Sequence, residues 1–445
     1  MDSDKKVYLY YIAAIVVVLL GVYLFATKNV IPNDVVQIRW SVDPSDLRDL
    51  TIENYEKTHP NIHIVIDPNP DMQSILTQLA GNVAPDIVTT YTIDTFRRLQ
   101  RLNQLEDLTP YIEEYNINVK EVRPELWPFM RIAEDDPRVF GIPDSAGPYL
   151  LYFNKDVFDK YGVEYPTNDM TWDEMYQKAK TLTTYKTVNG RKVVNTKGLD
   201  TGVDSEFYIR MYGGRIFSPD GKKCIIDKEN AKMGLRQWEN LHRKDRILPT
   251  SSDLSVMGPS NGLSGAGQLI AAGKVAMLLS GRHVLLQLRE YYPKGVRIGT
   301  VRCPKSPCIN NLLNSKCFCI PKKSKHKKEA AEFLAYILSD ENQMLVNDYA
   351  DGWSAISNPE IDKKAEFNPK YPQEDNNKEL LKDFDGSGVR EMSPYINETD
   401  LHSICGMEYD YVWQDLQSMD TAADHIRERV DKIIQRNLKN PNFIN

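Results

Sequence analysis

The stretch GIPDSAGPYLLYFNKDVFDKYG, residues 141–162, decides how this 445-residue chain is organised. It opens with turn-forming glycines and prolines and continues with five apolar residues, YLLYF, at 149–153. A run this short and this apolar predicts a strand that is buried on both faces. Asn154 can cap the helix that follows, and Gly162 can end it. The chain therefore starts a new α/β unit at about one third of its length.

The alternation of strands and helices extends outward from this stretch. Thr171 and Glu174 form a capping box for the next helix. Before the stretch, strand-like segments at 35–40, 62–66 and 84–88 alternate with amphipathic helical segments. This order predicts an α/β fold with mostly parallel sheets and helices on both faces. Because open α/β sheets bind ligands outside the carboxyl ends of their strands, polar residues that follow these strands are candidate ligand contacts.

Composition and motifs exclude several classes of protein. A length of 445 residues exceeds what one core usually serves, so two lobes are expected. The net charge of −7 argues against binding of nucleic acid. The sequence contains no HExxH, GxSxG or phosphate-loop motif, and Pro60 separates His59 from His63, so these histidines cannot share a helix face for a metal. We therefore expect no cofactor and no catalysis, and we interpret the lysine-rich run 322–328 as a solvated turn.

Two segments carry a family resemblance. The order Tyr152-Phe-Asn-Lys-Asp-x-Phe158, a short helix, a proline and TWDE at 171–174 resembles the family 1 extracellular solute-binding proteins of ABC transporters. These are the sugar-binding relatives of maltose-binding protein. The sequence GKVAM at 273–277 is similar to the Gly-Lys-x-Ala-Met segment of the same family. The resemblance covers roughly residues 35–440.

The resemblance implies a two-lobe periplasmic-binding-protein-like fold with three crossings between the lobes. Lobe 1 is expected to contain residues 35–145 plus 303–338, and lobe 2 residues 146–302 plus 339–445. The implied function is capture of a carbohydrate-like solute between the lobes and its delivery to ABC permease subunits. A ligand-sensing subunit of a signalling system is one alternative. A carbohydrate-active enzyme is another, and it would need two carboxylates that flank the scissile bond.

The N-terminus predicts a membrane anchor. Residues 7–26, VYLYYIAAIVVVLLGVYLFA, carry no charge and are long enough to cross a bilayer, which takes about 20 residues. Lys5 and Lys6 place the tail 1–6 in the cytoplasm, so the linker 27–34 and the bulk of the chain lie outside. A cleaved secretory signal is the alternative, although its apolar core is usually shorter and followed by a cleavage site.

The six cysteines leave three interpretations open. Cys303, Cys308, Cys317 and Cys319 lie close together in the sequence, whereas Cys224 and Cys405 are distant. An even number outside the cytoplasm suggests disulfides, and alternation in a strand would point Cys317 and Cys319 to one face, toward partners at 303–308. Free thiols in the core and, less favoured by the spacing, a metal site are the other two interpretations.

Candidate ligand residues follow the expected strand ends and crossings. Sugars are held by aromatic faces together with carboxylates, amides and guanidinium groups. The candidates are Trp40, Asp43, Thr89, Tyr91, Asp94, Ser145, Tyr149, Asp204, Ser205, Arg282, His283 and Trp353. Each of the aromatic residues Trp40, Tyr149 and Trp353 could instead belong to the core. Asp43 and Asp94 could instead cap helices.

Arg282 and His283 suggest a charged ligand. Relatives carry Gly-x-Trp after the GKxAM strand, where the tryptophan stacks on the sugar, whereas this chain reads Gly281-Arg282-His283. A guanidinium suits bidentate contact with a carboxylate or sulfate. The resemblance together with this departure predicts an anionic or partly anionic carbohydrate. The alternative is that Arg282 pairs with an acid of its own lobe and His283 caps the next helix.

Overall fold

The structure is a computed structural model that describes residues 35–81, 83–131, 136–257, 263–306, 308–309, 311–349 and 352–440. The expected tail, anchor and linker, residues 1–6, 7–26 and 27–34, lie outside these residues. Within the part that is described, no helix combines the length and the apolar character needed to span a bilayer.

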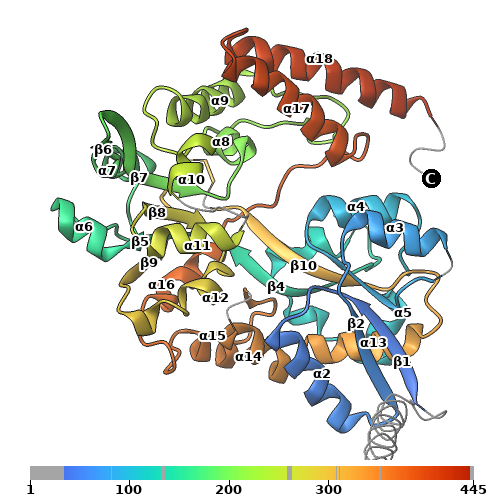
Figure 1. The fold of residues 1–445 in the computed structure, drawn as a ribbon. Coiled ribbons are helices and arrows are strands. Elements are labelled where there is room, and N and C mark those ends of the chain that lie inside the picture. Colours follow the sequence, from blue (N-terminus) through green and yellow to red (C-terminus); the bar gives the residue numbers. More distant parts are fainter. Residues whose placement is uncertain are drawn as a thin grey trace, which may run out of the picture.

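Lobe 1 is built on a six-stranded sheet with the order β11-β4-β10-β3-β1-β2 (Figure 1). Its strands are β1 (Val36–Ser41), β2 (Ile62–Asp67), β3 (Ile87–Thr90), β4 (Ile142–Pro148), β10 (Leu313–Cys319) and β11 (Trp353–Ser354). The helices of this lobe are α2 (Asp46–Thr58), α3 (Met72–Ala80), α4 (Ile93–Arg101), α5 (Thr109–Glu114), α13 (Lys327–Ile337), α14 (Asp340–Asp348) and α15 (Pro359–Ala365), with short 3-10 turns at Val119–Glu121 and Pro124–Phe129.

Lobe 2 is built on a five-stranded sheet with the order β6-β7-β8-β5-β9. Its strands are β5 (Leu150–Asn154), β6 (Thr184–Val188), β7 (Arg191–Thr201), β8 (Val275–Ser280) and β9 (Ile298–Arg302). Its helices are α6 (Lys155–Tyr161), α7 (Trp172–Leu182), α8 (Ser205–Met211), α9 (Glu229–His242), α10 (Ser251–Met257), α11 (Leu263–Ala271), α12 (Val284–Leu288), α17 (Glu398–Trp413) and α18 (Met419–Leu438). The segment α16 (Asn377–Leu380) packs near β9, and 3-10 turns lie at Tyr292–Lys294 and Leu381–Phe384.

The stretch 141–162 folds as the sequence predicts. Every residue of β5 is buried, and the strand lies between β8 and the edge strand β9 of the lobe 2 sheet. The Asn154 side chain accepts a hydrogen bond from the Val157 amide, and Gly162 ends α6 with a φ of 63°. Thr171 and Glu174 form both bonds of the capping box at the start of α7. These features depend on local contacts, which is why the sequence predicts them.

The sheets are mixed, which corrects the expectation of mostly parallel sheets. Among the described strands, parallel pairing is confined to β1–β2, β1–β3 and β7–β8. The strands β4, β5, β9 and β10 pair in antiparallel fashion with their neighbours. Of these four, β10 runs against β3 and β5 runs against β8, so each lobe carries a reversed strand beside its parallel pairs.

The third crossing lies later in the chain than expected. Residues 339–445 were assigned to lobe 2, but Trp353 and Ser354 of β11 pair with Ala146 and Ser145 of β4. Helix α14 also packs against α2 and β11. The chain therefore stays in lobe 1 through α14 and β11.

All six cysteines are free, which corrects the prediction of disulfides among Cys303, Cys308, Cys317 and Cys319. Cys317 and Cys319 do point to one face, but that face is the core of lobe 1, where the Cys317 thiol lies 3.0 Å from the Phe129 carbonyl. Cys303 lies in the core of lobe 2, and Cys308 is exposed. The expected partners therefore belong to different lobes.

Candidate functional site

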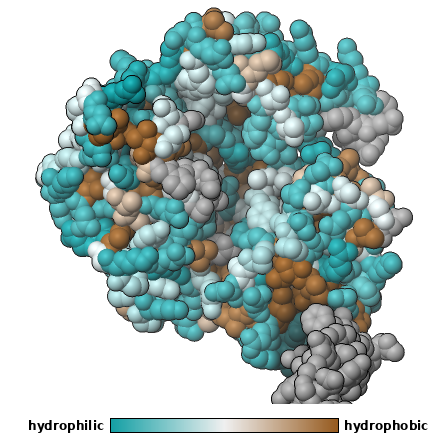
Figure 2. Space-filling model, in the orientation of Figure 1, coloured by the Kyte–Doolittle hydropathy of each residue, from teal (hydrophilic) through white to brown (hydrophobic). Residues whose placement is uncertain are grey.

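A cavity of about 570 Å³ lies between the lobes. Figure 2 shows the surface hollowed in this region. We call this cavity the cleft. Its lining comes from both lobes and from the crossings: Asp43, Tyr91, Thr92, Ser145, Gly147, Tyr149, Gly281, Arg282, His283, Leu286, Gln287, Asn314, Ser315, Lys316, Gly352 and Arg390.

Asp43 and Tyr91 form the lobe 1 wall of the cleft. The Tyr91 hydroxyl donates a hydrogen bond to the Asp43 carboxylate, and the Asp43 amide donates to the same hydroxyl at 3.0 Å. Burial, together with the Asp43 carboxylate, raises the pKa of the Tyr91 phenol, so it stays protonated as a donor. Thr92 next to it caps α4. Loops after β1 and β3 therefore hold one carboxylate and one aromatic ring at the carboxyl edge of the sheet, as the sequence suggests.

The first crossing supplies the floor. The Tyr149 backbone is fixed by Asn311, whose side chain accepts from the Tyr149 amide at 3.0 Å and donates to its carbonyl at 2.7 Å. The Tyr149 ring packs edge-on against Phe207, with ring centroids 5.8 Å apart, and its hydroxyl accepts a hydrogen bond from the Asn314 side chain. The Ser315 hydroxyl donates to the Ser145 carbonyl at 2.7 Å. Tyr149 thus presents its hydroxyl and part of its ring to the cleft from a fixed backbone.

Arg282 forms no ion pair with an acid of its own lobe among the described residues, and its contact with an anionic ligand stays a prediction. Its guanidinium donates to the backbone carbonyls of Asn347 at 2.9 Å and Gly352 at 2.7 Å, both in lobe 1. It also stacks over the Trp353 ring, with Cζ 3.9 Å from the ring centroid. Burial lowers the pKa of Arg282 to about 10, so the side chain stays cationic at neutral pH. Arg282 therefore ties lobe 2 to lobe 1 at the edge of the cleft, and the adjacent His283 lines the cavity.

Trp40, Thr89 and Trp353 are fully buried and do not line the cleft. Trp40 packs edge-on against Phe318 and Phe333 with centroid distances of 5.0 and 5.3 Å. These side chains stabilise lobe 1, which is the core role that the sequence left open for the two tryptophans.

Asp94, Asp204 and Ser205 lie near the cleft but not in its lining. Asp94 is buried in the first turn of α4, 3.9 Å from Arg101, and burial together with Glu398 raises its pKa to about 6. Asp204 caps α8 and pairs with Arg390, which does line the cleft. The Ser205 hydroxyl lies 3.2 Å from the Tyr409 hydroxyl.

Several lining residues are absent from the set chosen from the sequence. They are Thr92, Gly147, Gly281, Leu286, Gln287, Asn314, Ser315, Lys316, Gly352 and Arg390. Lys316 pairs with Ser145 beside an irregularity in the β4–β10 ladder, and its ammonium lies 5.8 Å from the Tyr91 ring centroid. Lys316 lies on β10, where the chain has returned from lobe 2 to lobe 1, and this place beside a crossing could have identified it as a candidate. Arg390 lies outside regular structure, and no sequence signal marks it.

Comparison with known proteins identifies the family. A model of the bacterial extracellular solute-binding protein family matches residues 41–344. The chain belongs to this family. It is similar to a multiple sugar-binding protein of Streptococcus mutans, at 21% identity over 72% of this chain and 74% of the relative. It is also similar to an arabinooligosaccharide-binding protein of Bacillus subtilis, at 24% identity over 73% of this chain and 79% of the relative.

Solved structures show the same fold. An ABC substrate-binding protein of Listeria monocytogenes in complex with cycloalternan aligns with a TM-score of 0.75 at 21% identity, over 89% of this chain and 98% of the other. A maltose-bound protein of T. maritima aligns with a TM-score of 0.71 at 18% identity, over 89% and 99% of the two chains. The two-lobe solute-binding fold is thereby established. The family binds solutes outside the cytoplasm and does not catalyse a reaction.

Proposed function

We propose that this protein captures a sugar or oligosaccharide in the cleft and delivers it to the permease of an ABC transporter. The observation that carries the proposal is the cavity of about 570 Å³ lined by side chains from both lobes. A solute that contacts both lobes favours the closed arrangement, which couples binding to a change of shape. The names of the relatives, which bind sugars and arabinooligosaccharides, support the same class of ligand.

The chemistry of the lining suits a polyhydroxylated ring. Tyr91 and Tyr149 offer aromatic surface from two sides of the cleft, which favours contact with the C–H faces of a sugar. Asp43 can accept hydrogen bonds from hydroxyl groups, and Gln287 and Asn314 can both donate and accept. A few directed polar groups among aromatic walls are typical of small-molecule sites.

An anionic or partly anionic carbohydrate is the finer form of this proposal. The support from Arg282 is weaker than the sequence suggested, because its guanidinium is used by two carbonyls. Lys316 and Arg390 now supply the cationic groups that face the cleft, one near Tyr91 and one from lobe 2. Arg390 also contacts Asp204 and lies 3.6 Å from Glu398, so a ligand would share it with these acids.

A thermal-shift screen over neutral sugars, uronates and sulfated sugars tests both the proposed carbohydrate ligand and its proposed negative charge. Saturation at 100 times the dissociation constant stabilises a protein by about 2.7 kcal/mol, which is easily detected. We expect oligosaccharides to stabilise the chain, with uronates or sulfated sugars above neutral ones. Small-angle scattering should then show a smaller radius of gyration at saturation. An unchanged radius would contradict closure, and stabilisation by no carbohydrate would contradict the ligand class.

We further propose that residues 7–26 anchor the protein in the membrane, on the basis of their uncharged apolar sequence. N-terminal sequencing of the protein from membranes should find the segment intact. A mature chain that starts near Thr27 would show that the segment is a cleaved signal instead.

A further inference from the structure

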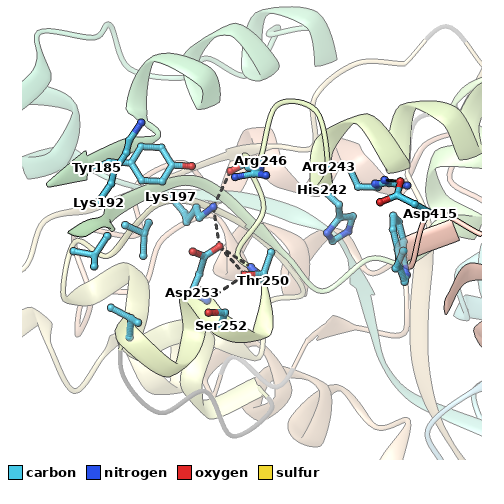
Figure 3. Close-up of a pocket in the computed structure, with 14 residues that line it drawn as sticks. Tyr185, Lys192, Lys197, His242, Arg243, Arg246, Thr250, Ser252, Asp253 and Asp415 are labelled. Atoms are coloured by element: carbon cyan, nitrogen blue, oxygen red, sulfur yellow. Dashed lines mark hydrogen bonds and ion pairs between the residues drawn. The ribbon is translucent and has the colours of Figure 1, made fainter. Parts of the chain in front are cut away.

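Lobe 2 contains a second cavity, of about 600 Å³, that is separate from the cleft. We call it the lobe 2 pocket (Figure 3). It is formed by the β6–β7 hairpin, the end of α9, α10 and the end of α17. The residues that line it are Tyr185, Lys192, Val193, Val194, Lys197, His242, Arg243, Arg246, Thr250, Ser252, Asp253, Val256, Trp413 and Asp415. It shares no lining residue with the cleft.

The lobe 2 pocket is cationic in a chain of net charge −7. Its lining contains two lysines and two arginines against two aspartates, and both aspartates are occupied. Asp253 lies 2.9 Å from the Lys197 ammonium, and Asp415 pairs with Arg243. Lys192 and Arg246 form no ion pair with any residue that the structure describes. Two positive charges are therefore left without an acid at this site.

Lys197 brings a buried ammonium to the same place. Its side chain is only 1% exposed, and it donates to the Arg246 carbonyl at 2.8 Å and to Asp253 (Figure 3). An ammonium has three N–H donors, so one remains for a further acceptor. Arg246 itself has a φ of 50°, a left-handed conformation that non-glycine residues rarely adopt. The bond from Lys197 to its carbonyl helps to hold Arg246 in this conformation beside the pocket.

Apolar and aromatic walls surround these cations. Tyr185 lies under the Lys192 ammonium, 4.5 Å from ring centroid to Nζ, and Val256 is 60% exposed at the rim. On the opposite side the rings of His242 and Trp413 lie 5.5 Å apart. Burial, followed by the charge of Lys197, lowers the pKa of His242, so this ring is neutral at physiological pH. The walls can accommodate an organic group, whereas the floor and one rim offer cationic donors.

We infer that the lobe 2 pocket binds a small molecule that carries a phosphate or sulfate group. The donors come from two different elements: Lys192 and Lys197 from β7, and Arg246 from the loop after α9. Cationic donors from more than one element that line a single cavity suit a tetrahedral oxyanion, which accepts bonds on all sides. The organic part of the ligand would lie against Tyr185, Val256 and Trp413. This site is independent of the proposed capture of a carbohydrate in the cleft.

The test is calorimetric titration of the purified full-length chain with inorganic phosphate and with phenyl phosphate at low ionic strength. We expect saturable binding of both, with phenyl phosphate tighter because its ring meets the apolar walls. In the double variant Lys192→Gln/Arg246→Gln, affinity for phosphate should fall about tenfold or more, since each cation contributes modestly at a solvated site. Tight binding of inorganic phosphate with no gain from the phenyl group would overturn the assignment of an organic ligand.

The matched control is Lys186→Gln/Arg191→Gln. These cations lie on the same hairpin, and strand alternation places them on the face opposite Tyr185 and Lys192. The control removes the same net charge, so an equal loss in both variants would reduce the effect to long-range electrostatics and overturn the proposal. So would absence of binding by the parent chain. The variant Lys316→Gln should retain phosphate binding, because Lys316 lines the cleft and not the lobe 2 pocket. Loss of phosphate binding in this variant would assign the anion to the cleft.

The His242 ring gives a second readout. With ¹³C-labelled histidine, the chain offers seven imidazole signals to assign. A bound phosphate should raise the pKa of His242, because it opposes the field of Lys197. The other imidazoles should titrate as before. An unchanged His242 titration at saturating phosphate would contradict binding at this site.

Discussion

The cleft and the lobe 2 pocket have similar volumes, about 570 and 600 Å³, but they use their cations differently. In the cleft, Arg282 is held by two carbonyls and Arg390 by nearby carboxylates. In the lobe 2 pocket, Lys192 and Arg246 have no acid partner within the described chain. A count of charged residues would rank the two sites alike. What differs is how much of the charge remains for a ligand.

The two cavities also differ in their relation to movement. The walls of the cleft belong to different lobes, so its volume changes when the lobes move. The walls of the lobe 2 pocket belong to one lobe and should keep their shape. We therefore expect ligand binding in the cleft to be coupled to lobe closure and binding in the lobe 2 pocket to be insensitive to it.

The largest effect is expected from removal of the buried cation. Arg282→Ala should lower the free energy of unfolding by about 3 kcal/mol, because it leaves two buried carbonyls without a donor and a cavity beside Trp353. Denaturation in urea measures this loss. Arg246→Ala is the comparison, and it should change stability by less than about 0.5 kcal/mol, since that side chain is exposed. Similar losses of stability in the two variants would contradict the distinction between Arg282, which is bonded to buried carbonyls, and Arg246, which is exposed.

A titration should distinguish a buried carboxylate on α8, Glu206, from Asp253 in the lobe 2 pocket. Burial, and then the Glu391 carboxylate, raises the pKa of Glu206 to about 7, while the Glu391 amide donates to it at 2.7 Å. Because the pKa of Glu206 is raised in the folded state, the contribution of Glu206 to stability is present below about pH 4.5 and is lost as the pH rises through 7. Relative to Glu206→Gln, the parent chain should lose roughly 1–3 kcal/mol between pH 5 and 8.

The control for this titration is Asp253→Asn in the lobe 2 pocket. The pKa of Asp253 is lowered despite its partial burial, because Thr250 and Lys197 bond to the carboxylate. Its contribution is lost only as the pH falls through a value below 4, so the difference from the parent chain should be flat between pH 5 and 8. A sloping difference for Asp253→Asn, or a flat one for Glu206→Gln, would contradict the assignment.

The third prediction compares one tyrosine from each cavity. Tyr91→Ala should weaken the binding of a carbohydrate identified by the thermal screen about tenfold, through loss of ring contact and of the bond to Asp43. Tyr185→Ala removes the same ring from the lobe 2 pocket and should leave carbohydrate affinity unchanged. Isothermal titration measures both. If Tyr185→Ala weakens carbohydrate binding as much as Tyr91→Ala, the two sites are coupled and the comparison fails.

The features that the sequence predicts well are local. The strand β5, the Asn154 cap and the Thr171–Glu174 capping box all follow from neighbouring residues. Asp43 and Tyr91 both line the cleft because strand ends in α/β sheets gather at one edge, and their contact with a ligand stays a prediction. The family resemblance supplied the two lobes, which the comparisons confirm.

Features that depend on distant contacts were missed or misassigned. Trp40 at a strand end and Trp353 after Gly352 could be ligand contacts or core residues by sequence, and only tertiary packing decides that their rings lie in the core of lobe 1. Arg282 looked available because its partners are backbone carbonyls, which no sequence pattern identifies. The helix α10, a wall of the lobe 2 pocket, lies in a polar segment where no apolar periodicity marks a helix.

The smallest effect concerns the acid inside the lobe 2 pocket. Asp253 partly neutralises Lys197 at 2.9 Å, so it competes with any anion for that ammonium. Asp253→Asn should therefore tighten phosphate binding by about three- to fivefold, equivalent to roughly 0.6–1 kcal/mol, within the range of partly solvated ion pairs. Asp169→Asn is the matched control: its carboxylate is 81% exposed and pairs with Lys305, away from the lobe 2 pocket, and its loss changes the net charge equally. Calorimetry should show tighter binding in the first variant only. If phosphate binds Asp253→Asn more weakly, the carboxylate is needed to position Lys197, and the ammonium is then a structural group instead of a ligand for the anion.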